Sequence, residues 1–217
     1  MTPDIFQPLN RYFDKIYVLS LPHTTARHAN VAKVLDGLNW CYFWGTDKKD
    51  YSSTQVIEQQ IYDDVAHRHT KRTSRSMNLG EVACALSHRN IYQNMLDEGH
   101  QRILILEDDV LPQPDQLQYF DSVIGQLPED WELLMLGYYG HKLPTLRYRL
   151  QQQIYLGFHY LRVANWHKVS RSWIDNICMR SHSPDVYQMG KVLGAHAYAV
   201  SASAAEKFVK YQTPVHL

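Results

Sequence analysis

The segment ILILEDDV, residues 103–110, joins four consecutive aliphatic residues to three consecutive acids. A short, continuous aliphatic run is typical of a strand that is buried in a sheet. The three carboxylates, Glu107, Asp108 and Asp109, then emerge at the carboxyl end of that strand. Ligands of open α/β sheets bind outside the carboxyl ends of the strands. The segment therefore predicts an α/β fold and the position of its site.

Segments on both sides of residues 103–110 complete the pattern of an α/β domain. Asn78 is a good N-cap with Glu81 at the third helical position, and it begins a long helix that ends at Gly99. The other predicted elements are a strand, a helix and a strand over 15–21, 23–38 and 41–47, a turn and a helix over 112–128, a strand over 131–138, and a strand followed by a helix over 194–211. The strand–helix–strand opening is typical of α/β proteins.

The composition is that of an ordinary globular domain. At about 150 residues per domain, 217 residues favour a single domain over 1–217. Hydrophobic residues make up 45% of the chain, which argues against long disorder. The charges of the 22 basic and 22 acidic residues cancel to a formal net charge of zero, which argues against a protein that binds nucleic acid over its whole surface.

Cysteine usage and the absence of long apolar runs indicate in which cellular compartment the protein is expected. Cys41, Cys84 and Cys178 are too widely spaced for a disulfide framework or a CxxC metal site, so we expect reduced thiols in a cytoplasmic protein. The N-terminus lacks the pattern of a signal peptide, and no apolar run approaches the roughly 20 residues that span a bilayer. The chain is expected not to cross a membrane, although it can rest on one.

Glu107 and Asp109 are predicted to share one face of the strand end, with Asp108 on the other. Two carboxylates on one face repel each other unless a cation lies between them. Oxygen ligands of this kind suit Mg²⁺ or Mn²⁺, which would in turn hold a diphosphate. The alternative is a purely structural strand end that caps a helix and meets an arginine.

Other polar residues near small residues are candidates for the same site, each with a structural alternative. Glu81 can be a ligand contact or only a capping residue, and His88 can be functional or only a helix histidine. His196, beside Gly194, is a candidate metal ligand or a structural histidine. Arg27, in the first strand–helix turn, can face a phosphate or lie on the surface.

Charge is unevenly distributed along the chain. Residues 97–132 hold ten acids and one arginine, whereas residues 133–174 hold six Lys or Arg and no acid. Salt bridges between neighbouring faces would explain this, and so would a site for a cation and a phosphate. The basic segment 66–77 is expected to be a mobile solvated loop, or alternatively a lid that meets phosphates.

Five segments together resemble glycosyltransferase family 25, which includes bacterial lipo-oligosaccharide galactosyltransferases and collagen galactosyltransferase domains. The most specific feature is the pair LGEVACALSH and LEDD, some twenty residues apart. The other segments that carry the resemblance are IYVLSLPHTTARHANV, WELLMLGY and GAHAYAVSASAAEKFV, and all occur in the family's order.

The resemblance implies a GT-A-like fold, a nucleotide-binding mixed sheet flanked by helices, and an inverting transfer of galactose or glucose from a UDP-hexose. It implies Mn²⁺ or Mg²⁺ as cofactor and a lipid-linked or free oligosaccharide acceptor in lipopolysaccharide or lipo-oligosaccharide biosynthesis, with peripheral contact at the inner face of the membrane. Carried over residue by residue, it places metal ligands at Asp109, Glu107 and His196, catalytic acids at Glu107 and Asp108, and donor-binding residues at Ser20, Leu21, Arg27, Glu81, Ser87, His88, Gly194 and Tyr198.

Two departures from the family pattern leave an alternative open. The turn after the first strand reads SLPHTTARH and retains only Arg27 of the family's charged residues. The family usually continues beyond TPVHL (213–217) with an acid, so we expect a chain that lacks the family's C-terminal end. Asp185, in the loop before Gly194, is then the candidate catalytic base, although a surface turn also suits it. The alternative function is a catalytically silent relative that binds a nucleotide-sugar or a partner protein.

Overall fold

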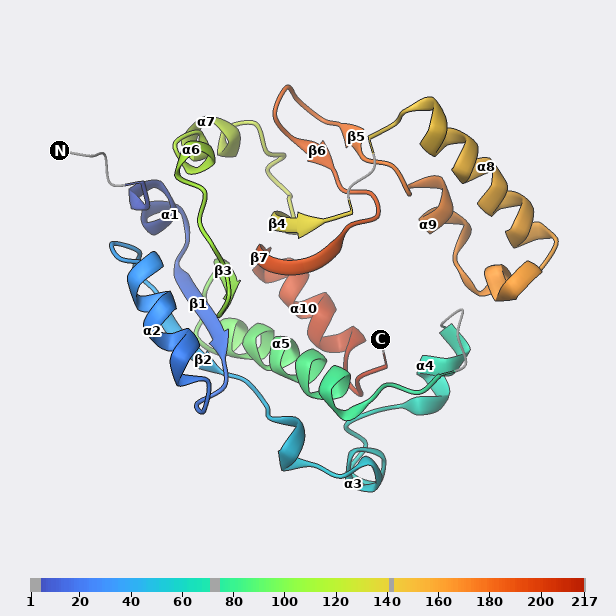
Figure 1. Cartoon of the computed structure of the whole chain (residues 1–217), viewed down its shortest axis with the longest axis horizontal. Coiled ribbons are helices and arrows are strands. Elements are labelled where there is room, and N and C mark those ends of the chain that lie inside the picture. Colours follow the sequence, from blue (N-terminus) through green and yellow to red (C-terminus); the bar gives the residue numbers. More distant parts are fainter. Residues whose placement is uncertain (1–4, 71–74, 141–142, 217) are drawn as a thin grey trace.

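The computed structural model describes residues 5–70, 75–140 and 143–216. Its main sheet has five strands in the order β2-β1-β3-β7-β4 (Figure 1). These strands are β1 (Lys15–Ser20), β2 (Cys41–Trp44), β3 (Arg102–Glu107), β4 (Leu133–Tyr139) and β7 (Leu193–Ser201). β1 pairs in parallel with β2 and β3, whereas β7 runs antiparallel to both β3 and β4. The predicted α/β class with a mixed, helix-flanked sheet is confirmed.

The helices and a small two-stranded sheet complete the described chain. The helices are α1 (Gln7–Tyr12), α2 (Thr25–Val34), α3 (Ser53–Glu58), α4 (Asp64–Thr70), α5 (Leu79–Asp97), α6 (Pro114–Leu117), α7 (Phe120–Ile124), α8 (Leu146–Tyr160), α9 (Arg171–Asp175) and α10 (Ala202–Tyr211), with 3-10 turns at Lys48–Asp50 and Val163–Lys168. The small sheet joins β5 (Arg180–Ser181) to β6 (Tyr187–Gln188). No helix in the described ranges has the length and apolarity to cross a bilayer.

Alternate residues of the strands build two cores on opposite faces of the main sheet. Leu104 and Leu106 of β3 pack with residues of α1, α2 and α7. Ile103 and Ile105 pack on the other face with residues of α5 and α10. Both faces of β3 are covered, which is why its sequence is a continuous aliphatic run.

Capping residues are present at two helices, and those of α5 are the ones predicted from the sequence. Asn78 Oδ1 accepts a hydrogen bond from the amide of Glu81, and the Glu81 carboxylate accepts one from the amide of Asn78. Gly99, at φ +71°, follows the end of α5. Ser201 caps α10 by accepting from the amide of Ala204.

The expectation of a loop over 66–77 was wrong in its first part, because helix α4 extends to Thr70. Asp63 accepts a hydrogen bond from the amide of Ala66 at the start of this helix, and Asp64 forms an ion pair with Arg68 one turn later. These local interactions stabilise a helix that a basic composition does not reveal. Residues 71–74 of the segment lie outside the described ranges.

Candidate functional site

The carboxyl ends of β1 and β3 meet the first half of β7 at one edge of the main sheet. In the strand register Leu19 lies opposite Glu107, and Leu106 lies opposite Ala197. Because β7 is antiparallel to β3, the residue that precedes Ala197 lies beside the residue that follows Leu106. The fold thus places His196 next to Glu107, although 89 positions separate them.

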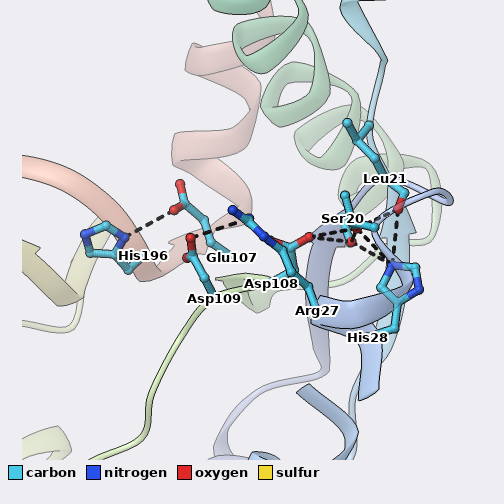
Figure 2. A network of polar contacts seen from close by, with 9 residues as sticks. Ser20, Leu21, Arg27, His28, Glu107, Asp108, Asp109 and His196 are labelled. Carbon is cyan, nitrogen blue, oxygen red and sulfur yellow. Dashed lines mark hydrogen bonds and ion pairs between the residues drawn. The ribbon is translucent and has the colours of Figure 1, made fainter. Parts of the chain in front are cut away.

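Glu107, Asp109 and His196 form a compact cluster at this edge (Figure 2). One ligand atom from each residue lies within 4.8 Å of the others. His196 Nδ1 is 3.2 Å from Glu107 Oε2, while His196 Nε2 is buried without a hydrogen-bond partner among the described residues. The Nδ1 atom faces the carboxylates, whereas Nε2 lies on the Gly194 side of the ring. Two carboxylates with one imidazole nitrogen fit a divalent cation.

Asp108 points away from the cluster, as the alternation along a strand predicts. Its buried carboxylate accepts hydrogen bonds from Ser20 Oγ at 2.6 Å, Arg27 at 2.5 Å and Thr24 Oγ1 at 3.2 Å. Burial by itself would raise the pKa of Asp108, but the hydrogen bonds from Ser20 and Arg27 outweigh it, and the pKa is lowered. Asp108 therefore fixes β1, the following turn and β3 relative to one another.

Arg27 links the two sides of the acidic strand end. Besides its contact with Asp108, it lies 3.5 Å from Asp109 Oδ2. The hydrogen bond and charge of Asp108 raise the pKa of Arg27. Its side chain is 54% exposed, so the guanidinium still has donors on the open side of the site.

A cavity of about 270 Å³ lies between the first turn, α5 and the acidic strand end. It is lined by five of the predicted donor-binding residues, namely Ser20, Leu21, Arg27, Ser87 and His88, and by Glu107 and Asp108. Lys48, Thr24 and Thr46 also line it, although they were not predicted to belong to the site. Their positions depend on how the turns after β1 and β2 fold over α5, for which the sequence carries no local signal.

A larger cavity of about 700 Å³ lies on the other side of the cluster. Asp109 and His196 line it together with Leu111, Tyr138 and Tyr139. The acidic strand end thus separates two cavities, one lined by Glu107 and Asp108, the other by Asp109.

Ser87 and His88 lie on α5 behind the smaller cavity, where their hydrogen bonds stay within the protein. Ser87 Oγ donates to Ala83 O at 2.7 Å and accepts from the amide of Thr46 at 2.8 Å. His88 Nδ1 lies 2.6 Å from the hydroxyl of Tyr198, which is 2.8 Å from the hydroxyl of Tyr92. Burial lowers the pKa of His88 to about 4 and raises that of Tyr198 well above its usual value, so both rings are neutral.

Glu81 has a structural role in the described chain. It completes the capping box of α5 and forms a two-oxygen ion pair with Arg75, which lies outside that helix. The hydrogen bonds from Arg75 and the amide of Asn78 lower the pKa of Glu81 to about 2. It lies in an apolar cavity beside His88 and Tyr198, and it is not among the residues of either cavity at the acidic cluster.

The structure does not bring Asp185 to the cluster. Its carboxylate accepts a hydrogen bond from Gln126 Nε2 at 2.9 Å, and its amide donates to Gln126 Oε1 at 3.2 Å. It lies between β5 and β6 and lines a separate cavity with Trp131. This position fits the surface-turn alternative for Asp185 and offers no contact with the acidic strand end.

Aromatic residues beside the turn that follows β1 were also not predicted from the sequence. His28 Nε2 lies 3.0 Å from Ser20 Oγ, so the ring joins the network around Asp108 (Figure 2). Its ring packs on Tyr42 and Trp44, and Trp44, at the carboxyl end of β2, is 49% exposed. The alternation of Tyr42 and Trp44 was the available signal, because alternate residues of a strand share a face.

Gly194 holds His196 in place by leaving room for its ring. Its φ is +76°, and a Cβ there would lie 2.8 Å from His196 Nε2 and 2.9 Å from Tyr139 Cε2. We expect Gly194→Ala to cost about 1–2 kcal/mol of stability from backbone strain and to displace the His196 ring. Chemical denaturation and the NMR signals of the His196 ring measure the two effects.

Gly99→Ala is the matched control, because Gly99 has a similar φ of +71° but no neighbour within 4 Å of its Cβ position. It should show the strain without a change at His196. An unmoved His196 ring in Gly194→Ala would contradict the role assigned to Gly194.

A five-stranded mixed sheet flanked by helices, with an acidic cluster at its carboxyl edge, defines an α/β protein of GT-A-like fold. Residues 13–217 match the family model "Glycosyltransferase family 25 (LPS biosynthesis protein)". The chain belongs to glycosyltransferase family 25, and the predicted family membership is confirmed.

Curated relatives are similar to part of this chain. It is 31% identical over 131 residues to "Glycosyltransferase 25 family member" of Anopheles gambiae and 26% identical over 135 residues to "Procollagen galactosyltransferase 1" of Danio rerio. These matches cover 56% and 58% of this chain and 21% of each relative. A match to "Probable inactive glycosyltransferase 25 family member 3" of Rattus norvegicus is 25% identical over 148 residues and covers 60% of this chain and 24% of that protein. The chain thus spans about a fifth of the length of these relatives.

Proposed function

We propose that this chain is a metal-dependent, inverting hexosyltransferase that moves galactose or glucose from a UDP-sugar to a hydroxyl of a glycan. The observation that carries this proposal is the cluster of Glu107, Asp109 and His196 between two cavities. Family membership supports the transfer of a sugar, and the name of the Danio rerio relative supports galactose. The words "LPS biosynthesis protein" in the family description support a lipid-linked or free oligosaccharide of lipopolysaccharide as acceptor, and a cytoplasmic reaction.

We propose that Asp109, Glu107 and His196 hold Mn²⁺ or Mg²⁺. Such an ion supplies positive charge that stabilises the departing diphosphate. Asp109 and Glu107 offer the oxygen ligands that both ions prefer, and His196 adds an imidazole that suits Mn²⁺ better than Mg²⁺.

The two cavities suggest where the substrates bind. We propose that the UDP moiety binds in the cavity of about 270 Å³, where Arg27 and Lys48 supply positive charge. The acceptor then approaches from the cavity of about 700 Å³, where Tyr138 and Tyr139 offer aromatic rings to a sugar. The acidic strand end lies where the two substrates would meet.

In the proposed reaction, the acceptor oxygen bonds to the anomeric carbon of the hexose while the bond from that carbon to UDP breaks. UDP leaves with the bonding electron pair, and the acceptor loses its proton to a carboxylate. Asp108 is a poor base because three donors saturate it and its pKa is lowered. Glu107 is the better candidate if its Oε2 atom, which faces His196, is the oxygen offered to the cation and the other oxygen takes the proton.

A thermal-shift titration tests the proposal directly. We expect UDP and UDP-hexoses to raise the melting temperature in the presence of Mn²⁺, and an adenine nucleotide to have no effect. A ligand at a hundredfold excess over its dissociation constant stabilises the native state by about 2.7 kcal/mol, which is readily measured. A chain that responds to no uridine nucleotide, with or without metal, would contradict the proposed donor site.

The second candidate function is a silent binding protein, and the match to a relative named as probably inactive favours it. Such a protein would bind UDP-sugar or a partner protein without transferring the sugar. Turnover of a UDP-hexose with a glycan acceptor by the purified chain would exclude this alternative. Metal-dependent binding of UDP without any turnover would support it.

A further inference from the structure

We propose that the outer face of helix α8 docks on a membrane surface that carries anionic lipid headgroups. This inference is independent of the reaction proposed above, since it concerns a surface outside both cavities at the acidic cluster. It rests on three features of α8, namely its anchoring, its exposed apolar residues and the charges beside them.

The inner face of α8 is held firmly by the segments that follow it. Tyr155 stacks on Trp166 with ring centroids 4.2 Å apart, and Trp166 is only 8% exposed. Gln152 Nε2 donates to the carbonyl oxygens of Ile174 and Asp175 at 2.9 and 2.8 Å. The helix therefore has a fixed orientation, with its opposite face turned outward.

That opposite face carries a continuous row of exposed apolar side chains, which we call the α8 stripe. Its members follow one another at intervals of three or four residues, and residues so spaced share one face of a helix. They are Leu146, Leu150, Ile154, Phe158 and Leu161, and their exposed fractions are 75%, 57%, 54%, 36% and 76%. The stripe is about 22 Å long, because 15 steps of about 1.5 Å separate Leu146 from Leu161. Figure 1 shows α8 at the rim of the molecule, on the side of β4 and away from β2.

The charges beside the stripe are all positive. Arg147 and Arg149 lie on the first turn of α8, and Arg162 follows its last turn. None of the three forms an ion pair with another described residue, and there is no acid between residues 133 and 174. They do not line either cavity at the acidic cluster, so these three arginines of the basic block serve neither of the two roles first considered for that block.

This charge pattern favours an anionic lipid surface over a second copy of the chain. A symmetric pair of α8 stripes would bring the arginines of one copy close to those of the other, where like charges repel. Helices with an apolar row of Leu, Ile and Phe flanked by arginine lie instead in the interface of a bilayer, with the apolar side chains inserted and the cations at the headgroups.

Co-sedimentation of the full chain with vesicles tests this proposal. We expect the wild type to pellet with vesicles of phosphatidylcholine and phosphatidylglycerol, and to pellet far less with phosphatidylcholine alone. Replacing Arg147 and Arg149 with Gln should lower partitioning into the anionic vesicles about twenty-fivefold, because each cation near such a surface contributes about fivefold. Leu150→Ser with Ile154→Ser should lower it at least about tenfold, because the inserted apolar area is lost.

Matched substitutions elsewhere on the surface control for general effects. Ile57→Ser removes an apolar side chain with 53% exposure, close to the 54% of Ile154, and Lys33→Gln with Lys210→Gln removes two exposed charges. Both controls should leave partitioning nearly unchanged. Circular dichroism of every variant establishes that it is folded.

Two kinds of result would overturn the proposal. One is equal sedimentation with anionic and neutral vesicles, or sedimentation that none of the α8 variants changes. The other is a wild-type chain that self-associates by analytical ultracentrifugation and becomes monomeric in Leu150→Ser with Ile154→Ser, because the stripe would then be an interface between copies of the chain.

Discussion

Asp109→Asn is expected to lower the rate of sugar transfer by about a hundredfold to a thousandfold, as removal of electrostatic stabilisation at a reacting centre usually does. The amide keeps the size of the side chain but loses the charge that a divalent cation needs. Transfer to a glycan acceptor from UDP-hexose with Mn²⁺ measures the rate. The thermal shift caused by UDP with Mn²⁺ should shrink in the same variant.

Asp109 is a clean position for this test because it contributes little to stability. Its side chain is 53% exposed, and its ion pair with Arg27 is a surface contact at 3.5 Å, worth less than about 1 kcal/mol. Asp115→Asn, an exposed acid on α6, is the control and should keep the wild-type rate. A folded Asp109→Asn protein with an undiminished rate would rule out the proposed metal site.

Acidification is expected to destabilise the wild type through His88, by about 2 kcal/mol between about pH 7.5 and about pH 5. Burial lowers the pKa of His88 from 6.5 to about 4 in the folded state. Below about pH 6.5 the unfolded chain therefore binds a proton that the folded chain does not yet bind, so the free energy of unfolding falls with pH. This loss continues until the pH reaches about 4 and amounts to about 3 kcal/mol.

Urea denaturation of wild type and His88→Gln at the two pH values measures this contribution. Glutamine can still hydrogen-bond to Tyr198 but does not titrate, so the variant should show a smaller difference between the two pH values. His69→Gln, which changes an exposed histidine on α4, should behave like the wild type. If His88→Gln retains the full difference, another group is responsible for the acid sensitivity.

Local patterns in the sequence were sufficient to predict most of the main sheet and the helix α5. The aliphatic run of β3 has partners on both faces, and Asn78, Glu81 and Gly99 define the two ends of α5. These signals involve residues that are close in the sequence, so they can be recognised without the tertiary structure. The error at α4 arose because the cap, Asp63, and the acidic partner of the i,i+4 ion pair, Asp64, precede the basic segment 66–77, whose own composition carries no helix signal.

The candidate site was predicted only in part, because its contacts join distant segments. The sequence placed Glu107 and Asp109 on one face of a strand end. It did not show that Asp108 would be saturated by Ser20, Thr24 and Arg27. Arg27, expected to face a phosphate or the surface, also joins α2 to the acidic strand end through Asp108 and Asp109. Such roles depend on burial and on the register between strands.

The sequence alone determined the elements with strong local periodicity and the acidic end of β3, because side-chain alternation and helix capping are properties of neighbouring residues. Only the tertiary structure decided what surrounds that acidic end. The antiparallel pairing of β7 with β3 brings His196 beside Glu107, and the packing of α8 on Trp166 turns an apolar, basic-flanked face outward. Both arrangements follow from pairing and packing between residues that are distant in the sequence, so the partners of each residue depend on the complete fold.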